Sequence, residues 1–185
     1  QKRKDWNGLI SGFKASDLVF LDESGCNTDM TRRYAYSLGG SRTVDSAPLS
    51  KPKNTTILSS IQLDGTLRYT TFSGGTTVER FKRYLETDLL PHLNGNSVLI
   101  MDNMKSHHAK AVKNLLDSSE IRYISLPPYS PDLNPIEKLW SKVKSFLRKF
   151  KARTLDALPN AIQNAFHSVT ISDCSGWFRF CGYAL

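Results

Sequence analysis

The sequence predicts one mixed α/β domain in which helices flank a central sheet. Two observations support this fold class. Short apolar runs with strand character alternate with longer segments of helical periodicity, and the two most β-rich runs follow one another across a tight turn. At 185 residues the chain is also long enough to bury one substantial core. We therefore expect a mixed sheet whose first part is antiparallel.

The first half of the chain is predicted to supply most of the strands. A basic leader or linker, residues 1–16, precedes an apolar run that ends at Asp22. Asp64 and Gly65 between two β-rich runs are a strong tight-turn signal and predict a hairpin. The predicted strands lie at residues 18–22, 34–38, 55–63 and 66–72.

The second half alternates helices with single strands. Apolar residues recur at helical spacing from Val78 until Pro91 ends the run, and another helix starts near Asn134. The other predicted elements are strands at 97–101 and 121–126, helices at 106–117 and 155–169, and an aromatic tail at 177–180. The helix from Asn134 places its apolar face on Ile136, Leu139, Trp140, Val143, Leu147 and Phe150. This order fits an RNase H-like mixed sheet with flanking helices.

The composition favours a polyanionic partner and gives no sign of a membrane span or a zinc cluster. Lys and Arg total 25 against 17 Asp and Glu, for a net charge of +8, and such a balance is typical of proteins that bind nucleic acid. No run approaches the roughly 20 apolar residues that a membrane span needs, and no signal peptide is predicted. Three scattered cysteines fit reduced thiols in a cytoplasmic protein better than a disulfide framework.

Three acidic residues stand where a catalytic site of this fold class would form. Asp22 and Asp102 each end an apolar strand, and Glu137 starts the helix after the proline-rich stretch at residues 128–135. Carboxylates at the carboxyl ends of strands point into the crevice where ligands of α/β sheets gather. Carboxylates suit Mg²⁺, and two cations about 3.5 to 4 Å apart stabilise both oxygens of a phosphodiester displacement. The three residues therefore predict a two-metal site.

Each acid also has a structural explanation. Asn134, Pro135 and Glu137 match a helix N-cap, a first-turn proline and a capping-box acid. Asp22 and Asp102 match turn residues at strand ends. The coincidence of all three acids favours the catalytic interpretation over three separate structural ones.

Three motifs resemble the DDE transposases of the mariner superfamily. They are residues 20–24, residues 101–103 with His107 downstream, and residues 130–137 with Trp140. The 34 residues between the second aspartate and the glutamate also look like the spacing in this superfamily, particularly in its bacterial insertion-sequence branch. The resemblance extends from the first predicted strand almost to the end of the chain.

The resemblance implies a transposase catalytic domain. Such a domain uses two Mg²⁺ ions, with Mn²⁺ as a substitute, to cleave DNA at transposon ends, after which the freed 3′ hydroxyl attacks target DNA. It implies that Asp22 bridges both metals, while Asp102 and Glu137 each complete the ligands of one ion. The candidates for supporting these ligands or contacting the substrate are Glu23, Asn103 and His107. For His107, an exposed histidine at a helix start is an equally good explanation.

Several basic residues are candidates for phosphate contacts. Lys144 and Arg148 lie on the same helical stripe as Glu137, although an ordinary solvated helix face explains them too. Further candidates, all in predicted loops, are Arg32, Arg33, Lys51 and Lys53.

The expected domain organisation is the leader at residues 1–16 followed by a DDE catalytic domain at residues 17–185. Superfamily members carry a helix-turn-helix module upstream, and we expect it to be absent here. The expected partners are double-stranded DNA, a second copy in a synaptic homodimer, and a separate upstream DNA-binding half. The expected location is the cytoplasm, in association with the nucleoid. An RNase H-like nuclease without strand transfer and an idle DNA-binding remnant stay open as alternatives.

Overall fold

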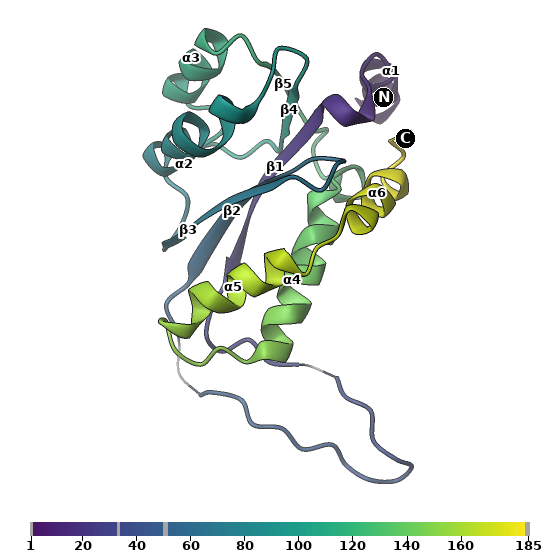
Figure 1. Ribbon diagram of the computed structural model, residues 1–185, viewed down its shortest axis with the longest axis vertical. Helices are drawn as coiled ribbons and strands as arrows, with labels where there is room; N and C mark the ends of the chain where they lie inside the picture. The colour runs from purple at the N-terminus through teal and green to yellow at the C-terminus, as the bar shows by residue number, and fades with distance from the viewer. Residues whose placement is uncertain (1, 33, 50–51, 184–185) are drawn as a thin grey trace.

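The computed structural model describes residues 2–32, 34–49 and 52–183, and its core is a five-stranded sheet in the order β3-β2-β1-β4-β5 (Figure 1). The strands are β1 (Leu18–Cys26), β2 (Thr55–Ile61), β3 (Leu67–Ser73), β4 (Val98–Met101) and β5 (Arg122–Ser125). The first three strands pair antiparallel, whereas β1, β4 and β5 pair parallel. The predicted mixed sheet with an antiparallel start is confirmed.

Helices cover both faces of this sheet. They are α1 (Lys2–Ile10), α2 (Val78–Tyr84), α3 (Lys110–Ser118), α4 (Ile136–Phe150), α5 (Ala157–His167) and α6 (Ile171–Phe180). In Figure 1, α2 and α3 lie on one side of the sheet, and α4, α5 and α6 lie on the other. No helix in the described part of the chain is long and apolar enough to cross a membrane.

The first strand contributes to both cores because its side chains alternate between the two faces. Phe20 packs with α4, α5 and α6, and its ring meets the ring of Phe178 edge-on at 5.4 Å between centroids. Val19 and Leu21 pack on the opposite face against α2 and α3. The strand is therefore buried on both sides, as central strands of parallel sheets are.

The predicted hairpin between β2 and β3 is confirmed. Ile61 pairs with Leu67, and the backbone N–H of Thr66 donates to Oδ1 of Asp64 at 2.8 Å. Gly65 has a φ of +88°, a conformation that glycine adopts without steric cost. The Asp-Gly pair thus sets the turn by side-chain hydrogen bonding and by backbone freedom together.

The two helices nearest the predicted acids differ slightly from the prediction. α3 starts at Lys110 and not at residue 106, so residues 105–108 form turns. The apolar face of α4 is buried from Ile136 to Leu147, but Phe150 is 45% exposed. Phe150 lies in the last turn, where it stacks on Phe146 instead of entering the core.

The predicted strand at residues 34–38 is wrong. The described residues of this segment have no strand partner and lie in the long β1–β2 connection, which extends away from the body (Figure 1). Tyr34 and Tyr36 are almost fully exposed, at 89% and 105%. Their strand propensity fails because propensity only stabilises a strand that has a neighbour to pair with.

Both ends of the described chain are more structured than the sequence indicated. Within the predicted leader, α1 places Trp6 in the core at 3% exposure. The predicted aromatic tail is part of α6, which starts with a capping box between Thr170 and Asp173. Phe178 of this helix is fully buried, so the aromatic residues complete the core.

Candidate active site

Asp22 lies inside β1 and not at its end, which corrects the sequence prediction. The parallel pairing of β1 with β4 stops at Leu21 and Met101, but β1 continues to Cys26 along β2, with Asp22 opposite Ser59. The strand continues because β2 still supplies hydrogen bonds after β4 has ended. Asp22 therefore sits at the point where β4 leaves the sheet, and there the crevice opens.

The three predicted acids line one cavity of about 450 Å³. Asp22 comes from β1, Asp102 follows the last residue of β4, and Glu137 is in the first turn of α4. The prediction that these acids come together is confirmed by this arrangement. The other residues that line the cavity are Asn103, Met104, Leu126, Pro127, Pro128, Tyr129, Ser130, Pro131 and Asn134.

Asp22 is an unusually buried carboxyl group, at 9% exposure. The backbone N–H of Glu23 donates to its Oδ1 at 2.8 Å, and Nε1 of Trp140 donates to its Oδ2 at 3.2 Å. Burial raises the pKa of Asp22 to about 7, and the charges of Asp102 and Glu137 add to this, although both hydrogen bonds oppose it. A cation in the cavity would favour the ionised form.

Asp102 has one occupied and one free oxygen. Its Oδ1 accepts from the backbone N–H of Met104 at 3.0 Å and lies 2.8 Å from Nδ1 of His107. No donor in the described residues contacts Oδ2. Partial burial alone would raise the pKa of Asp102, but the contacts with His107 and Met104 outweigh it and lower the pKa. Asp102 is thus held ionised with one oxygen available.

Glu23 and His107 meet behind the cavity. Glu23 faces away from Asp22 because neighbouring residues of a strand point to opposite faces, and its Oε2 lies 3.1 Å from Nε2 of His107. Burial lowers the pKa of His107, but the contacts with Asp102 and Glu23 overcome this effect and raise the pKa to about 9. The expectation of an exposed histidine at a helix start is wrong, since the His107 side chain is fully buried.

Asn103 lines the cavity from the other side of Asp102. Its Nδ2 donates to the carbonyl oxygen of Leu126 at 2.6 Å, and its Oδ1 lies 3.3 Å from Nε2 of His108. Asn103 therefore ties the turn after β4 to the end of β5, which fixes one wall of the cavity.

The start of α4 does not use the capping arrangement that the sequence allowed. Neither Asn134 nor Glu137 makes a side-chain cap, and the N-terminal residue of the helix is preceded by Pro135. The Oδ1 atom of Asn134 is buried without a hydrogen-bond partner among the described residues. Because Glu137 is not needed as a cap, the structural explanation for it is removed.

Two residues of the site, Trp140 and Tyr129, were not predicted from the sequence to take part in its chemistry. Trp140 was placed on the core face of α4, but its indole nitrogen bonds Asp22, one turn after Glu137. Tyr129 lies at the cavity with its ring 99% exposed and a φ of 54°, which is uncommon for a residue other than glycine. Helical spacing could have indicated Trp140, whereas no sequence signal marks the backbone of Tyr129.

Replacing Trp140 by phenylalanine should destabilise the protein more at pH 8 than at pH 5. Asp22 is mostly ionised at the higher pH, and a hydrogen bond to a charged group contributes more than one to a neutral group, by about 1 kcal/mol. The loss of ring volume costs the same at both pH values. Urea denaturation of both proteins at each pH measures this difference, and an equal loss at pH 5 and pH 8 would contradict it.

The basic candidates do not all reach the same place. Arg32 and Arg148 line a groove of about 750 Å³ between the β1–β2 connection and α4, together with Lys149, Tyr34 and Tyr36. Lys144 is half-buried and lies close enough to the Cys26 thiol to lower its pKa, against a larger rise caused by burial. Of the other loop candidates, Lys53 is exposed before β2, while Arg33 and Lys51 lie outside the described residues.

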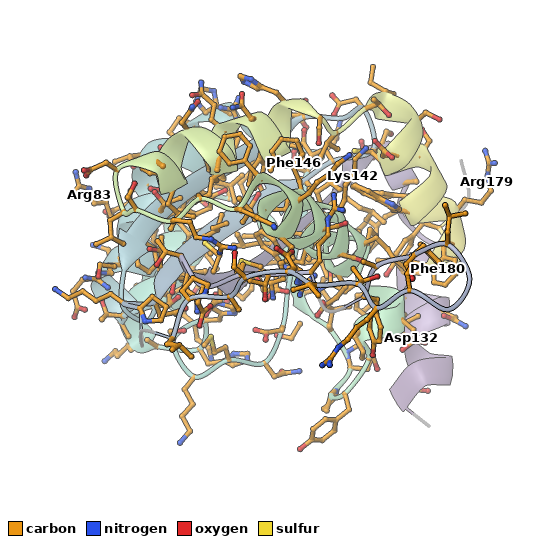
Figure 2. The ribbon with its side chains drawn as sticks, turned by 90° about the horizontal axis from the view of Figure 1, so that it is seen from below. Arg83, Asp132, Lys142, Phe146, Arg179 and Phe180 are labelled. Carbon is orange, nitrogen blue, oxygen red and sulfur yellow. The ribbon has the colours of Figure 1, made fainter. Side chains whose placement is uncertain are left out.

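The cations of the groove are available for a ligand. Within the described residues, Arg32, Arg148 and Lys149 make no ion pair or hydrogen bond through their side chains. Lys142 on the neighbouring face of α4 differs, because it pairs with Asp173 of α6. Lys142 and Phe146, labelled in Figure 2, line a hollow that α4 shares with the C-terminal segment. The free cations thus gather on one side of α4.

The cavity fits divalent cations that keep part of their water. Within the described residues, no three His, Cys, Asp or Glu side chains stand close enough together to enclose an ion. Mg²⁺, however, needs only a few carboxylates and retains several waters. Three carboxylates around one cavity, one of them with a pKa raised by burial and by the charges of the other two, are a donor set of this kind.

Comparison with known proteins identifies the family. The model of the family described as "DDE superfamily endonuclease" matches residues 17–159, which is more than half of the chain. The chain is 28% identical to the transposable element Tc1 transposase of Caenorhabditis elegans over 97 residues, which are 50% of this chain and 36% of that protein. The chain thus matches only about a third of that relative's length.

Solved structures agree in fold. The chain matches the pre-cleavage Mos1 transpososome with a TM-score of 0.81 at 18% identity, covering 96% of this chain and 57% of the Mos1 chain. It matches the Mos1 mariner paired end complex with Mn with a TM-score of 0.77 at 19% identity, covering 95% and 54%. These matches confirm the predicted RNase H-like fold. By its family model, the chain belongs to the DDE superfamily endonucleases.

Proposed function

We propose that this chain is a transposase catalytic domain that cleaves DNA at transposon ends and joins the freed end to target DNA. The observation that carries the proposal is the single cavity onto which β1, the end of β4 and the start of α4 bring Asp22, Asp102 and Glu137. The relatives named as transposases and the Mos1 complexes support it. The chain covers only part of the length of these proteins, so the complete transposase activity is a proposal for this chain.

The three carboxylates would hold two divalent cations, Mg²⁺ or Mn²⁺. When bound, these ions stabilise charge on the attacking and leaving oxygens of an in-line displacement at phosphorus. Asp22 would be able to hold a cation shared with either of the other acids, because each of its oxygens accepts only one hydrogen bond and retains a second lone pair. Asp102 would contribute its free Oδ2, and Glu137 would hold the ion from the start of α4. The structure of the Mos1 mariner paired end complex with Mn supports the use of a divalent cation.

The reaction needs no nucleophile from the protein. Water is the nucleophile for cleavage, and the resulting 3′ hydroxyl is the nucleophile for joining. The Cys26 thiol at the end of β1 is unsuitable, because burial raises its pKa to about 11 and so keeps it protonated. The carboxylates would therefore act by holding the cations and orienting them toward the reacting oxygens.

The DNA backbone would lie along the groove of Arg32, Arg148 and Lys149. Arginine and lysine bind phosphate oxygens, and the exposed rings of Tyr34 and Tyr36 offer stacking surfaces beside them. A net charge of +8 favours binding at low salt. Lys144, which lies at neither cavity, is proposed to add to the local positive potential without a direct contact.

Replacing Arg148 by alanine should weaken DNA binding and reduce its salt dependence. Loss of one phosphate contact lowers the slope of log K against log salt by about 0.9 for duplex DNA. Arg83, which points outward from α2 at the edge of the molecule (Figure 2), provides a control of equal charge change. Fluorescence anisotropy over a salt series measures both variants, and equal slopes for the two would contradict the groove assignment.

A joining assay tests the function as a whole. The chain is incubated with supercoiled plasmid and a pre-cleaved duplex end, in Mg²⁺ or Mn²⁺ and in EDTA. Metal-dependent cutting together with covalent joining of the duplex end to the plasmid is expected. Cutting without joining would favour an RNase H-like nuclease, and DNA binding with neither reaction would favour an idle DNA-binding remnant.

The domain is also proposed to work with partners and in a particular cellular location. The paired-end complex of Mos1 supports a homodimer that holds two DNA ends. An upstream DNA-binding half, a bacterial insertion-sequence origin and a cytoplasmic location with the nucleoid are proposed together, as the context in which such a domain would work.

A further inference from the structure

His107 is held rigidly although it lies in a turn between β4 and α3. Its side chain is 0% exposed, and its ring stacks on the ring of Phe81 at 4.1 Å between centroids and 25° between planes. Phe81 belongs to α2 and is itself fully buried. The orientation of the imidazole is therefore set by the core on the α2 side of the sheet.

The two ring nitrogens face carboxylates from different strands. Nδ1 lies 2.8 Å from Oδ1 of Asp102, beyond the end of β4, and Nε2 lies 3.1 Å from Oε2 of Glu23 in β1. The Nε2 contact with Glu23 has hydrogen-bond geometry, whereas Nδ1 meets Asp102 as an ion-pair contact and has no hydrogen-bond partner among the described residues. His107 thus links the two strands beyond Leu21 and Met101, where their own pairing has ended.

This link decides which oxygen of Asp102 faces the cavity. The Asp102 side chain is 46% exposed, and packing alone would not fix its rotation. His107 and the backbone N–H of Met104 both engage Oδ1. The rotation that satisfies both contacts leaves Oδ2 as the oxygen without a protein partner in the described residues.

We propose that His107 is a positioning residue which, clamped between Phe81 and Glu23, aims Oδ2 of Asp102 at the catalytic cation. It does not touch the substrate or the reacting atoms. The inference rests on the proposed metal-dependent function, and it assigns α2 a part in the site through Phe81. Residues that orient metal ligands in this way typically change metal affinity or activity by about 10- to 100-fold when they are replaced.

Two substitutions separate the two contacts of the ring. The amide nitrogen of asparagine falls close to the position of Nδ1, and that of glutamine falls close to the position of Nε2. His107→Asn should therefore keep the contact with Asp102, and His107→Gln should lose it while keeping the contact with Glu23. His92→Gln is the matched control, because His92 is an exposed histidine that does not line the catalytic cavity.

Mn²⁺ titration of the purified chain, followed by electron paramagnetic resonance, measures affinity without any reaction. We expect His107→Gln to bind Mn²⁺ about 10-fold or more weakly, His107→Asn to remain within about threefold of wild type, and His92→Gln to match wild type. In the joining assay, His107→Gln should need more Mg²⁺ for half-maximal rate while reaching a similar maximal rate. A merely structural role would lower the maximal rate through loss of folded protein.

The outcomes distinguish this inference from the proposed function. If Asp102→Asn weakens Mn²⁺ binding but a folded His107→Gln binds as wild type does, the positioning role is wrong and the metal site stands. If Asp102→Asn itself binds Mn²⁺ as wild type does, the metal site fails. Should His107→Gln unfold, Phe81→Leu decides, because it keeps an apolar side chain in the core and removes the ring that stacks on His107. Weaker Mn²⁺ binding by the folded Phe81→Leu variant would support the positioning role, and binding equal to wild type would contradict it.

Discussion

Replacing Glu137 by glutamine is expected to abolish metal-dependent DNA cleavage while leaving the fold intact. A metal clamp supplies several kcal/mol of transition-state stabilisation, and about 1.4 kcal/mol corresponds to tenfold in rate, so the loss should be roughly a thousandfold or more. Stability should change little, because the Glu137 side chain caps nothing and lines an open cavity. Plasmid cleavage rates in Mg²⁺ and Mn²⁺ give the measurement.

Glu79→Gln provides a matched control for this experiment. Glu79 also lies in the first turn of a helix, α2, and the substitution removes the same charge. It does not line the catalytic cavity. Cleavage by Glu79→Gln should remain within about twofold of wild type. If both variants lost activity equally, net charge and not the position of Glu137 would be responsible.

The metal-free protein should lose stability as the pH rises from 4 to 8, and Mg²⁺ should restore much of it. The pKa of Asp22 is about 7 in the folded chain against an ordinary value of 3.8. Since the folded state binds the proton more tightly, the stabilisation is complete below pH 3.8 and is lost as the pH passes through 7. A shift of this size corresponds to roughly 4 kcal/mol.

Urea denaturation in EDTA across this pH range measures the effect, and Asp22→Asn isolates it. The variant lacks the titrating carboxyl group, so the wild-type curve should fall relative to the curve of the variant as the pH rises. His107 contributes in the same direction at higher pH, because its raised pKa means that stability is lost between about 6.5 and 9, but it does so in both proteins. Parallel curves for wild type and Asp22→Asn would refute the burial effect.

The sequence predicted the sheet and the acids well because both depend on local patterns. The Asp-Gly turn, the apolar strands and the long amphipathic helix from Ile136 each contain their own signal, and each is found in the structure. Asp102 directly follows an apolar strand and Glu137 lies in the first turn of the long helix, so the strand and helix boundaries were enough to bring them together at one cavity.

The sequence predictions failed where contacts with residues distant in the sequence determine the structure. Tyr34 to Leu38 has strand propensity but no neighbouring strand, and β1 runs past Asp22 only because β2 lies beside it. The exposure of His107 could not be predicted from a turn sequence, since Phe81 covers its ring from another helix. The role of Trp140 was hidden in the same way, because an indole on an apolar face looks like any core residue.

The length of α4 has a further consequence for the distance between the catalytic cavity and a bound phosphate. Glu137 and Arg148 are separated by 11 residues of one helix, or roughly 16 Å at 1.5 Å per residue. That length equals about five nucleotide steps of duplex DNA. The helix would therefore set the distance between the cleaved phosphodiester bond and the phosphate that Arg148 contacts. One residue inserted after Trp140 would turn Arg148 by about 100° away from Arg32. The catalytic acids would keep their positions, but the phosphate contact at a fixed distance from them would be lost.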